Sequence, residues 1–248
     1  MKKIFLFLAI ASLAITSCRK DDDNTDTTET VSIETQNSYD DAAITQFLKD
    51  NYFDARGNIV AFSSSITTDD NEKPLAGYSP TTLPSGVVYI SRYVPANGKT
   101  IVSNDVLRIM QKSNTYVAVK ATDGTIKFDS QYSFRNTIDA SGSPEVDPAY
   151  FYVKNSILTN DTYKDKTRSY FEIEGLQEGL KYFKSTEVSD DANYNMQGVI
   201  IVPSRAAFAR DDHFAYSSYT FKDRSFVFSF YSSFYSKICT KIGNDFGV

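Results

Sequence analysis

The sequence predicts an α+β protein built on an antiparallel β-sheet, and three observations carry this prediction. Segments rich in β-branched and aromatic residues recur from residue 86 onward, and turn residues separate them. One short helical stripe, formed by Leu176, Leu180 and Phe183, interrupts these segments. Strands that lie before and after a single helix, rather than alternating with helices, favour an antiparallel sheet over a parallel α/β fold.

Residues 1–17 have the pattern of an export signal. Lys2 and Lys3 precede an apolar run over 4–15, which is too short to span a bilayer as a helix. The run ends in ITSC, which resembles a bacterial lipobox and implies cleavage before Cys18 and lipid attachment to that residue. The alternative is an ordinary secretory signal with an incidental cysteine. The expected location is the outer membrane of a Gram-negative envelope, facing the periplasm or exposed at the cell surface.

A tether and a helix are predicted between the anchor and the sheet. Residues 18–37 are rich in Asp, Thr, Glu and Asn and have few apolar positions, which predicts a disordered, flexible tether. In the next region, 38–82, Ser38 and Asp41 resemble a capping box, and apolar residues at helical spacing predict a helix from about 39 to 52. A polar stretch punctuated by Pro and Gly then predicts a linker or long loop over 63–82.

The region 83–238 holds the predicted sheet domain. Strands are expected at 87–94, 106–110, 116–121 and 125–128. The dipeptide DG at 123–124 marks a hairpin turn, and residues 135–170 are expected to form an irregular insertion. After the short helix, the apolar run 198–202 predicts a strand. The phenylalanines that alternate over 226–230 predict a last strand with one inward face.

Composition excludes several classes of function. The chain has 248 residues with 17 Tyr and 18 Phe, but no Trp, one His and two Cys. So few His and Cys leave little room for a His/Cys metal site or a His-dependent catalytic triad, and we expect no cofactor or metal. The net charge of −5 gives no electrostatic footprint for nucleic acid. The one histidine, His213, is flanked by Asp211 and Asp212, which predicts a solvated surface loop.

Three segments, in this order, resemble motifs of the FK506-binding-protein (FKBP) type of peptidyl-prolyl cis/trans isomerase. They are DGTIKFDS at 123–130, FEIEGLQEGL at 171–180 and VIIVPSRAAFA at 199–209. The closing segment SFVFSF at 225–230 and LPSGV at 83–87 are similar to further parts of the family pattern. The resemblance covers residues 83–235. It implies a twisted antiparallel sheet wrapped around a short helix, with the active pocket between them.

The first two motifs carry three of the pocket residues that the resemblance implies. Phe128 would form a wall, and Asp129 would be the carboxylate that faces the twisted carbonyl. Asp129 alternatively satisfies backbone N–H groups after the hairpin. Ile173 would offer its backbone N–H to the substrate while its side chain lines the pocket. For the tyrosine that the family has early in the sheet, Gln111 and Tyr116 compete.

The later motifs carry three further residues, with two departures from the family. Leu176 takes the place of the floor tryptophan and makes a smaller floor. Phe208 takes the place of a carbonyl-binding tyrosine and lacks the hydroxyl, which removes a hydrogen bond worth about 0.5–1.5 kcal/mol. Phe228 takes the place of a wall phenylalanine, and its alternative role is that of a core residue.

The resemblance implies a prolyl isomerase that assists the folding of exported proteins. Rotation about the Xaa-Pro bond breaks no covalent bond and needs no metal, His or nucleophile; its barrier of about 18–20 kcal/mol comes from amide resonance. An apolar pocket can stabilise the twisted amide relative to the planar one. The expected partners are proline-containing unfolded or exported polypeptides and, through Cys18, the membrane. One alternative is an FKBP-like lipoprotein with a degraded pocket that binds peptides or a partner without catalysis. Another is a surface glycan-binding lipoprotein.

Overall fold

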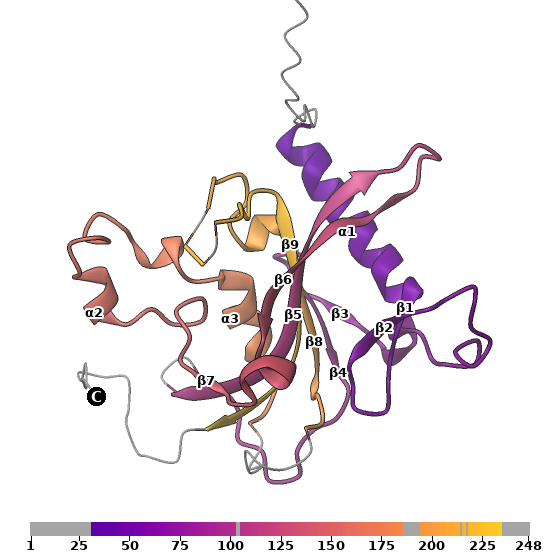
Figure 1. Ribbon diagram of the computed structural model, residues 1–248, viewed down its shortest axis with the longest axis horizontal. Helices are drawn as coiled ribbons and strands as arrows, with labels where there is room; N and C mark the ends of the chain where they lie inside the picture. The colour runs from indigo at the N-terminus through magenta and orange to yellow at the C-terminus, as the bar shows by residue number, and fades with distance from the viewer. Residues whose placement is uncertain (1–30, 103–104, 186–193, 214, 217, 235–248) are drawn as a thin grey trace, which may run out of the picture. The chain divides into compact units, whose positions relative to one another are not determined.

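The computed structural model describes residues 31–102, 105–185, 194–213, 215–216 and 218–234 (Figure 1). The expected signal, the lipidation site Cys18 and the tether up to residue 30 lie outside the described residues. Within the described ranges, no helix is long and apolar enough to cross a membrane.

The N-terminal helix α1 (Ile33–Asp50) starts earlier than predicted. Ser32 caps it, because its hydroxyl accepts a hydrogen bond from a backbone N–H of the first turn at 3.1 Å. The expected cap at Ser38 is therefore wrong, and the last part of the expected tether is helical. The first turns escaped prediction because the side chains they bury, those of Gln36 and Asp40, are polar.

Short elements connect α1 to the main sheet. Their bounds are β1 (Asn51–Phe53), β2 (Ile59–Ala61), η1 (Leu75–Tyr78) and β3 (Thr81–Thr82). The first two strands form an antiparallel hairpin, whereas β3 pairs with the main sheet. The stretch 63–82 was predicted as a linker or long loop, but Leu75 within it is fully buried and packs with residues of α1. This stretch is therefore part of the folded unit.

In the described residues, the main sheet has seven strands, and every pairing between them is antiparallel. The strand order is β3-β4-β8-β9-β5-β6, and β7 pairs with β5. The bounds are β4 (Val88–Ser91), β5 (Leu107–Lys120), β6 (Ile126–Asn136), β7 (Glu145–Val146), β8 (Gly198–Val202) and β9 (Arg224–Phe234). This arrangement confirms the predicted α+β class. The two strands expected at 106–110 and 116–121 are one continuous strand, β5.

Short helices fill the connections. Their bounds are η2 (Thr137–Ser141), α2 (Asn155–Leu158), η3 (Arg168–Tyr170), α3 (Glu174–Leu180) and η4 (Ser204–Ala206). α3 is the predicted short helix, and two glycines let it approach the sheet closely. A Cβ on Gly175 would lie 2.5 Å from Val202 Cγ1, and one on Gly179 would lie 2.7 Å from Ile200 Cγ2. Both contacts are with β8, so the glycines set the distance between α3 and the sheet.

Both faces of the sheet are buried, each under a different helix. Along β8, Ile200 and Val202 pack with residues of α3, whereas Val199 and Ile201 pack with residues of α1. The phenylalanines of 226–230 on β9 point to the α3 side, as the alternation predicted. We call the two sides the α3 face and the α1 face; Figure 1 shows the two helices on opposite sides of the strands. Which face of the sheet the N-terminal helix covers was not predicted.

Candidate functional site

Four of the six predicted pocket residues meet on the α3 face. Ile173, Leu176, Phe208 and Phe228 belong to one apolar cluster, and each is 5% exposed or less. Of these four, Phe208 borders an open pocket, whereas the other three lie within the core. Leu176 therefore takes part in packing α3 against the sheet rather than forming the floor of an open cavity.

Phe128 is not brought to these four residues. The Phe128 ring lies on the α1 face, where its centroid is 5.2 Å from that of Tyr116 and 5.7 Å from that of Phe47 in α1. Asp129 is exposed on β6. The predicted position of Phe128 as a wall of this pocket is therefore wrong, and Asp129 is not among the residues that line the open pocket beside Phe208. On the α1 face Phe128 packs against Phe47, a partner that the hairpin motif does not reveal.

The backbone N–H of Ile173 already has an acceptor. It donates to the carbonyl oxygen of Tyr150 at 2.8 Å, so it is not free to donate to a substrate. Tyr150 is buried, and its hydroxyl donates to Glu145 Oε2 at 2.5 Å and contacts the Gln111 amide. Burial, reinforced by the charge of Glu145, raises the pKa of Tyr150 well above its ordinary value. Gln111 thus lies in a buried network, while its competitor Tyr116 lies on the α1 face.

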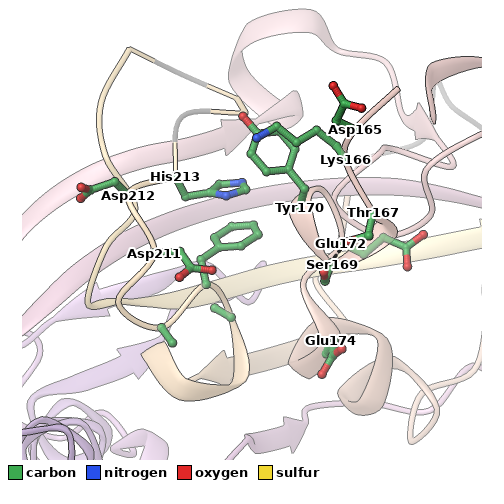
Figure 2. A pocket seen from close by; sticks show the side chains of 13 residues that line it. Asp165, Lys166, Thr167, Ser169, Tyr170, Glu172, Glu174, Asp211, Asp212 and His213 are labelled. Carbon is green, nitrogen blue, oxygen red and sulfur yellow. Dashed lines mark hydrogen bonds between the residues drawn. The ribbon is translucent and has the colours of Figure 1, made fainter. Parts of the chain in front are cut away.

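A pocket of about 560 Å³ opens between residues 165–174 and 207–213 (Figure 2). Three rings line it. The His213 ring stacks on Phe208 with centroids 3.7 Å apart, and its centroid lies 4.8 Å from that of Tyr170. We call this site the acidic–aromatic pocket. Its complete lining is Asp165, Lys166, Thr167, Ser169, Tyr170, Glu172, Glu174, Ala207, Phe208, Ala209, Asp211, Asp212 and His213.

Negative charge dominates the lining, since it contains five carboxylates and one ammonium group. Two of the carboxylates have a cationic neighbour: Glu172 pairs with Arg168 at 2.9 Å, and Asp212 lies 3.9 Å from the Lys222 ammonium. The Lys166 ammonium lies 4.4 Å from the centroid of the Tyr170 ring. The pocket therefore combines aromatic faces with carboxylates, an arrangement suited to cationic and apolar groups together.

His213 is buried, which contradicts the predicted solvated loop. Its side chain is 3% exposed, and its Nε2 atom has no hydrogen-bond partner among the described residues. Burial lowers the pKa of His213 to about 4; the Asp211 charge opposes this shift and the Lys166 charge adds to it. The imidazole is therefore neutral at pH 7. Its polar neighbours in sequence concealed the burial, which comes from the stacking contact with Phe208.

The low pKa of His213 predicts a specific loss of stability in acid. The pKa is about 4 in the folded chain and 6.5 in its ordinary state, so the unfolded chain binds the proton more readily between these values. The contribution of the neutral ring is fully present above pH 6.5 and is lost as the pH falls toward 4. We expect urea denaturation to show a steeper decline over this range for the wild type than for His213→Phe. Parallel declines would contradict the prediction.

A second pocket, of about 610 Å³, adjoins the first and shares Glu174 with it. Its lining includes Ser85, Gln177, Glu178 and Arg205, and among the described residues it contains no aromatic side chain. The Ser85 hydroxyl donates to Glu178 at 2.5 Å, so part of this polar surface is satisfied internally. The acidic–aromatic pocket is therefore the stronger candidate.

Sequence reasoning found Phe208 in this pocket but missed Tyr170 and His213 as partners. Within the described residues, no group of three or more His, Cys, Asp or Glu side chains could hold a metal ion. No family model matches the sequence, and a search of curated proteins finds no match. Function is therefore inferred from the pocket geometry and from the segments that resemble FKBP motifs.

Proposed function

We propose that this protein is an FKBP-like, membrane-anchored protein that binds proline-containing segments of exported polypeptides without catalysing their isomerisation. The observation that carries the proposal is an open pocket beside a backbone donor that is already occupied, both on the α3 face. An aromatic pocket is open beside Phe208, while the nearby N–H of Ile173, which the resemblance assigns to the substrate, is bonded to Tyr150.

Support for an FKBP-like fold comes from the positions of the similar segments. DGTIKFDS spans the turn that leads into β6, FEIEGLQEGL includes α3, and VIIVPSRAAFA runs from β8 through η4 to the pocket. SFVFSF lies within β9, next to β8 in the sheet. An antiparallel sheet with one short helix packed against a face is the arrangement that the resemblance implies.

Support for peptide binding comes from the size and lining of the acidic–aromatic pocket. Its volume of about 560 Å³ falls within the range of about 300–1,000 Å³ found for ligand pockets. Tyr170 is half-buried and presents a ring surface against which a proline ring can pack, and Phe208 borders the same pocket beside the stacked His213 ring. The pocket opens to the protein surface, so an extended chain can enter it without first unfolding the protein.

Support for binding without catalysis comes from the residues that the resemblance assigns to catalysis, because they do not line one common pocket. Phe128 lies on the α1 face, Asp129 is not among the residues that line the acidic–aromatic pocket, and Leu176 is buried in the core of the α3 face. A bound Xaa-Pro amide in this pocket therefore lacks the carboxylate and the backbone donor that the resemblance assigns to it. Binding that is equally strong for planar and twisted amides gives no acceleration.

Prolyl isomerisation is the second candidate, and one observation favours it. The rings of Phe208, Tyr170 and the neutral His213 form a weakly polar surface, and such a surface can stabilise the twisted amide, which is less polar than the planar one. On this alternative, the pocket surface replaces the missing polar contacts, and the exported clients are released with altered proline geometry.

The experiment uses the full chain in detergent micelles and a short peptide that contains Phe-Pro. Fluorescence anisotropy measures the affinity, and NMR exchange spectroscopy measures the rate of interconversion of the cis and trans peptide. We expect saturable binding, about fivefold weaker for Phe208→Leu, and no faster exchange; loss of one aromatic contact of about 1 kcal/mol corresponds to that factor. Asp129→Ala is the control and is expected to bind like the wild type.

The outcomes separate the candidates. Faster exchange that Phe208→Leu reduces would establish isomerisation instead of binding alone. Absence of peptide binding would contradict both candidates. Loss of binding in Asp129→Ala would place the site on β6, away from the acidic–aromatic pocket.

A further inference from the structure

Three carboxylates of the acidic–aromatic pocket lack an internal partner. In the part of the chain that the structure describes, the side chains of Asp165, Glu174 and Asp211 form neither an ion pair nor a hydrogen bond. Figure 2 shows Asp165 and Asp211 on either side of Tyr170 and His213, and Glu174 farther along the same pocket. Their negative charge is therefore directed at whatever occupies the pocket.

The rings of the pocket already accommodate a cation. The Lys166 ammonium lies 4.4 Å from the centroid of the Tyr170 ring, within the range of cation–π attraction. Lys166 is itself exposed, so this contact is open to exchange with another ammonium or guanidinium. The same ring is thus a surface on which a cationic side chain of a ligand can lie.

His213 supplies an independent indication that the pocket is built for a ligand. Its side chain is only 3% exposed and lines the pocket, yet Nε2 has no partner among the described residues. Its ring lies against those of Phe208 and Tyr170, with centroids 3.7 and 4.8 Å away (Figure 2). Because an unpaired buried nitrogen is costly, a ligand group that reaches this ring can gain a hydrogen bond that the free protein lacks.

We infer that the acidic–aromatic pocket selects basic polypeptide segments, placing a lysine or arginine side chain among Asp165, Glu174 and Asp211 and against the Tyr170 ring. The inference rests on the proposed function, because it names the class of polypeptide bound at the same site. A polypeptide is favoured over a small polyamine because Phe208 and Tyr170 offer apolar faces beside the carboxylates. A chain presents apolar and basic groups together, whereas a polyamine uses only the charges.

The test compares two amidated peptides on the full chain in detergent micelles at low salt. One is Lys-Phe-Pro-Lys, and the other has glutamine in place of both lysines. We expect about tenfold tighter binding of the lysine peptide, which corresponds to two exposed charge contacts of about threefold each. Asp165→Asn combined with Asp211→Asn is expected to abolish the preference. Asp70→Asn combined with Glu72→Gln removes the same charge from an exposed segment outside the pocket and should retain it.

Each remaining outcome has one meaning. Equal binding of the two peptides to the wild type overturns the charge inference while leaving the proposed function intact. Failure of both peptides to bind overturns the proposed function as well. A preference that survives in the Asp165/Asp211 double variant shows that these carboxylates do not carry it, and a preference that is lost equally in the Asp70/Glu72 control assigns it to the net charge of the chain; either result overturns the inference. Competition by spermidine as strong as that by the lysine peptide would identify a polyamine site instead.

Discussion

Replacing Asp40 by alanine is expected to lower the free energy of unfolding by about 3 kcal/mol. Asp40 is fully buried in α1, and three donors converge on it. The backbone N–H and the hydroxyl of Ser204 donate to Oδ2 at 2.8 and 2.6 Å, and the Gln36 amide donates to Oδ1 at 3.0 Å. Alanine leaves these buried donors without an acceptor, at about 1–3 kcal/mol for each that finds no other partner.

Part of this loss is offset, because the wild type buries a carboxylate. Burial raises the pKa of Asp40 above its ordinary 3.8, against the opposing effects of the Ser204 and Gln36 hydrogen bonds and the Arg205 charge. A carboxyl with a raised folded pKa binds its proton more readily when folded. Its stabilising contribution is therefore greatest in acid and declines as the pH rises from 3.8 through the raised value.

Asp40→Asn is the matched control for this prediction. The amide keeps the size, and its oxygen can accept from Ser204 while Gln36 turns its own amide to pair with the new N–H₂. We expect stability within about 1 kcal/mol of the wild type at pH 7 and no decline with rising pH from this position. Urea denaturation monitored by circular dichroism measures both variants. An alanine variant as stable as the asparagine variant would contradict the assigned role of the hydrogen bonds.

The Asp40 contact also influences the pocket, because Ser204 is the first residue of η4. This short helix leads directly into Phe208, and Arg205 within it pairs with Asp41 of α1 at 2.5 Å. The same guanidinium donates to the carbonyl oxygen of Asn37 at 3.2 Å. α1 therefore fixes the start of the loop that carries Phe208 and His213, although it covers the opposite face of the sheet.

The regular elements that local patterns specify could be predicted from the sequence. The β8 strand matches the apolar run 198–202, the DG pair occupies the turn before β6, and α3 falls on the helical stripe. Phe226 and Phe228 point to the α3 face, as their alternation required. For β8, α3 and β9 the periodicity within one element was sufficient, because the same residues that set the pattern also form the core, whereas the DG pair specifies its turn by its own conformational preference.

The remaining features depend on contacts between distant segments. Both faces of the sheet are buried because α1 packs on the side opposite α3, and the apolar spacing within the helix does not specify which face it covers. Phe128 was assigned to the pocket from a motif, but it lies on the α1 face, where it packs against Phe47 from a distant part of the sequence. The pattern of residues within one segment specifies neither the face that α1 covers nor the face on which Phe128 lies.

The candidate site was only partly predictable for the same reason. Phe208 was identified through its position in VIIVPSRAAFA, whereas Tyr170 and His213 become its neighbours when two loops meet. The acidic residues around 211 were visible in the sequence and were interpreted as a solvated loop. Local sequence does not reveal that His213, next to these acidic residues, stacks on Phe208. This stacking makes the loop one wall of the pocket.

Replacing Phe228 by alanine is expected to have the largest effect on stability, with a loss of about 3–5 kcal/mol, the usual range for a phenylalanine removed from a core. Phe228 is 1% exposed, its ring packs against Phe134 and Phe226, and its strand neighbours are Ser113 on β5 and Ile200 on β8. These contacts surround it on the α3 face, so the cavity left by alanine cannot be filled by a simple shift of one strand. Urea denaturation measures the loss.

The functional consequence distinguishes a core residue from a pocket wall. Because Phe228 does not border the acidic–aromatic pocket, Phe228→Leu should bind the Phe-Pro peptide with wild-type affinity once the fraction of folded protein is taken into account. Phe208→Leu, a matched change at a residue that does border the pocket, should weaken binding about fivefold, because it loses the ring contact. If instead Phe228→Leu weakened binding as much as Phe208→Leu while remaining folded, the peptide would have to reach the interior of the α3 face. The pocket wall that the resemblance implied for Phe228 would then be restored.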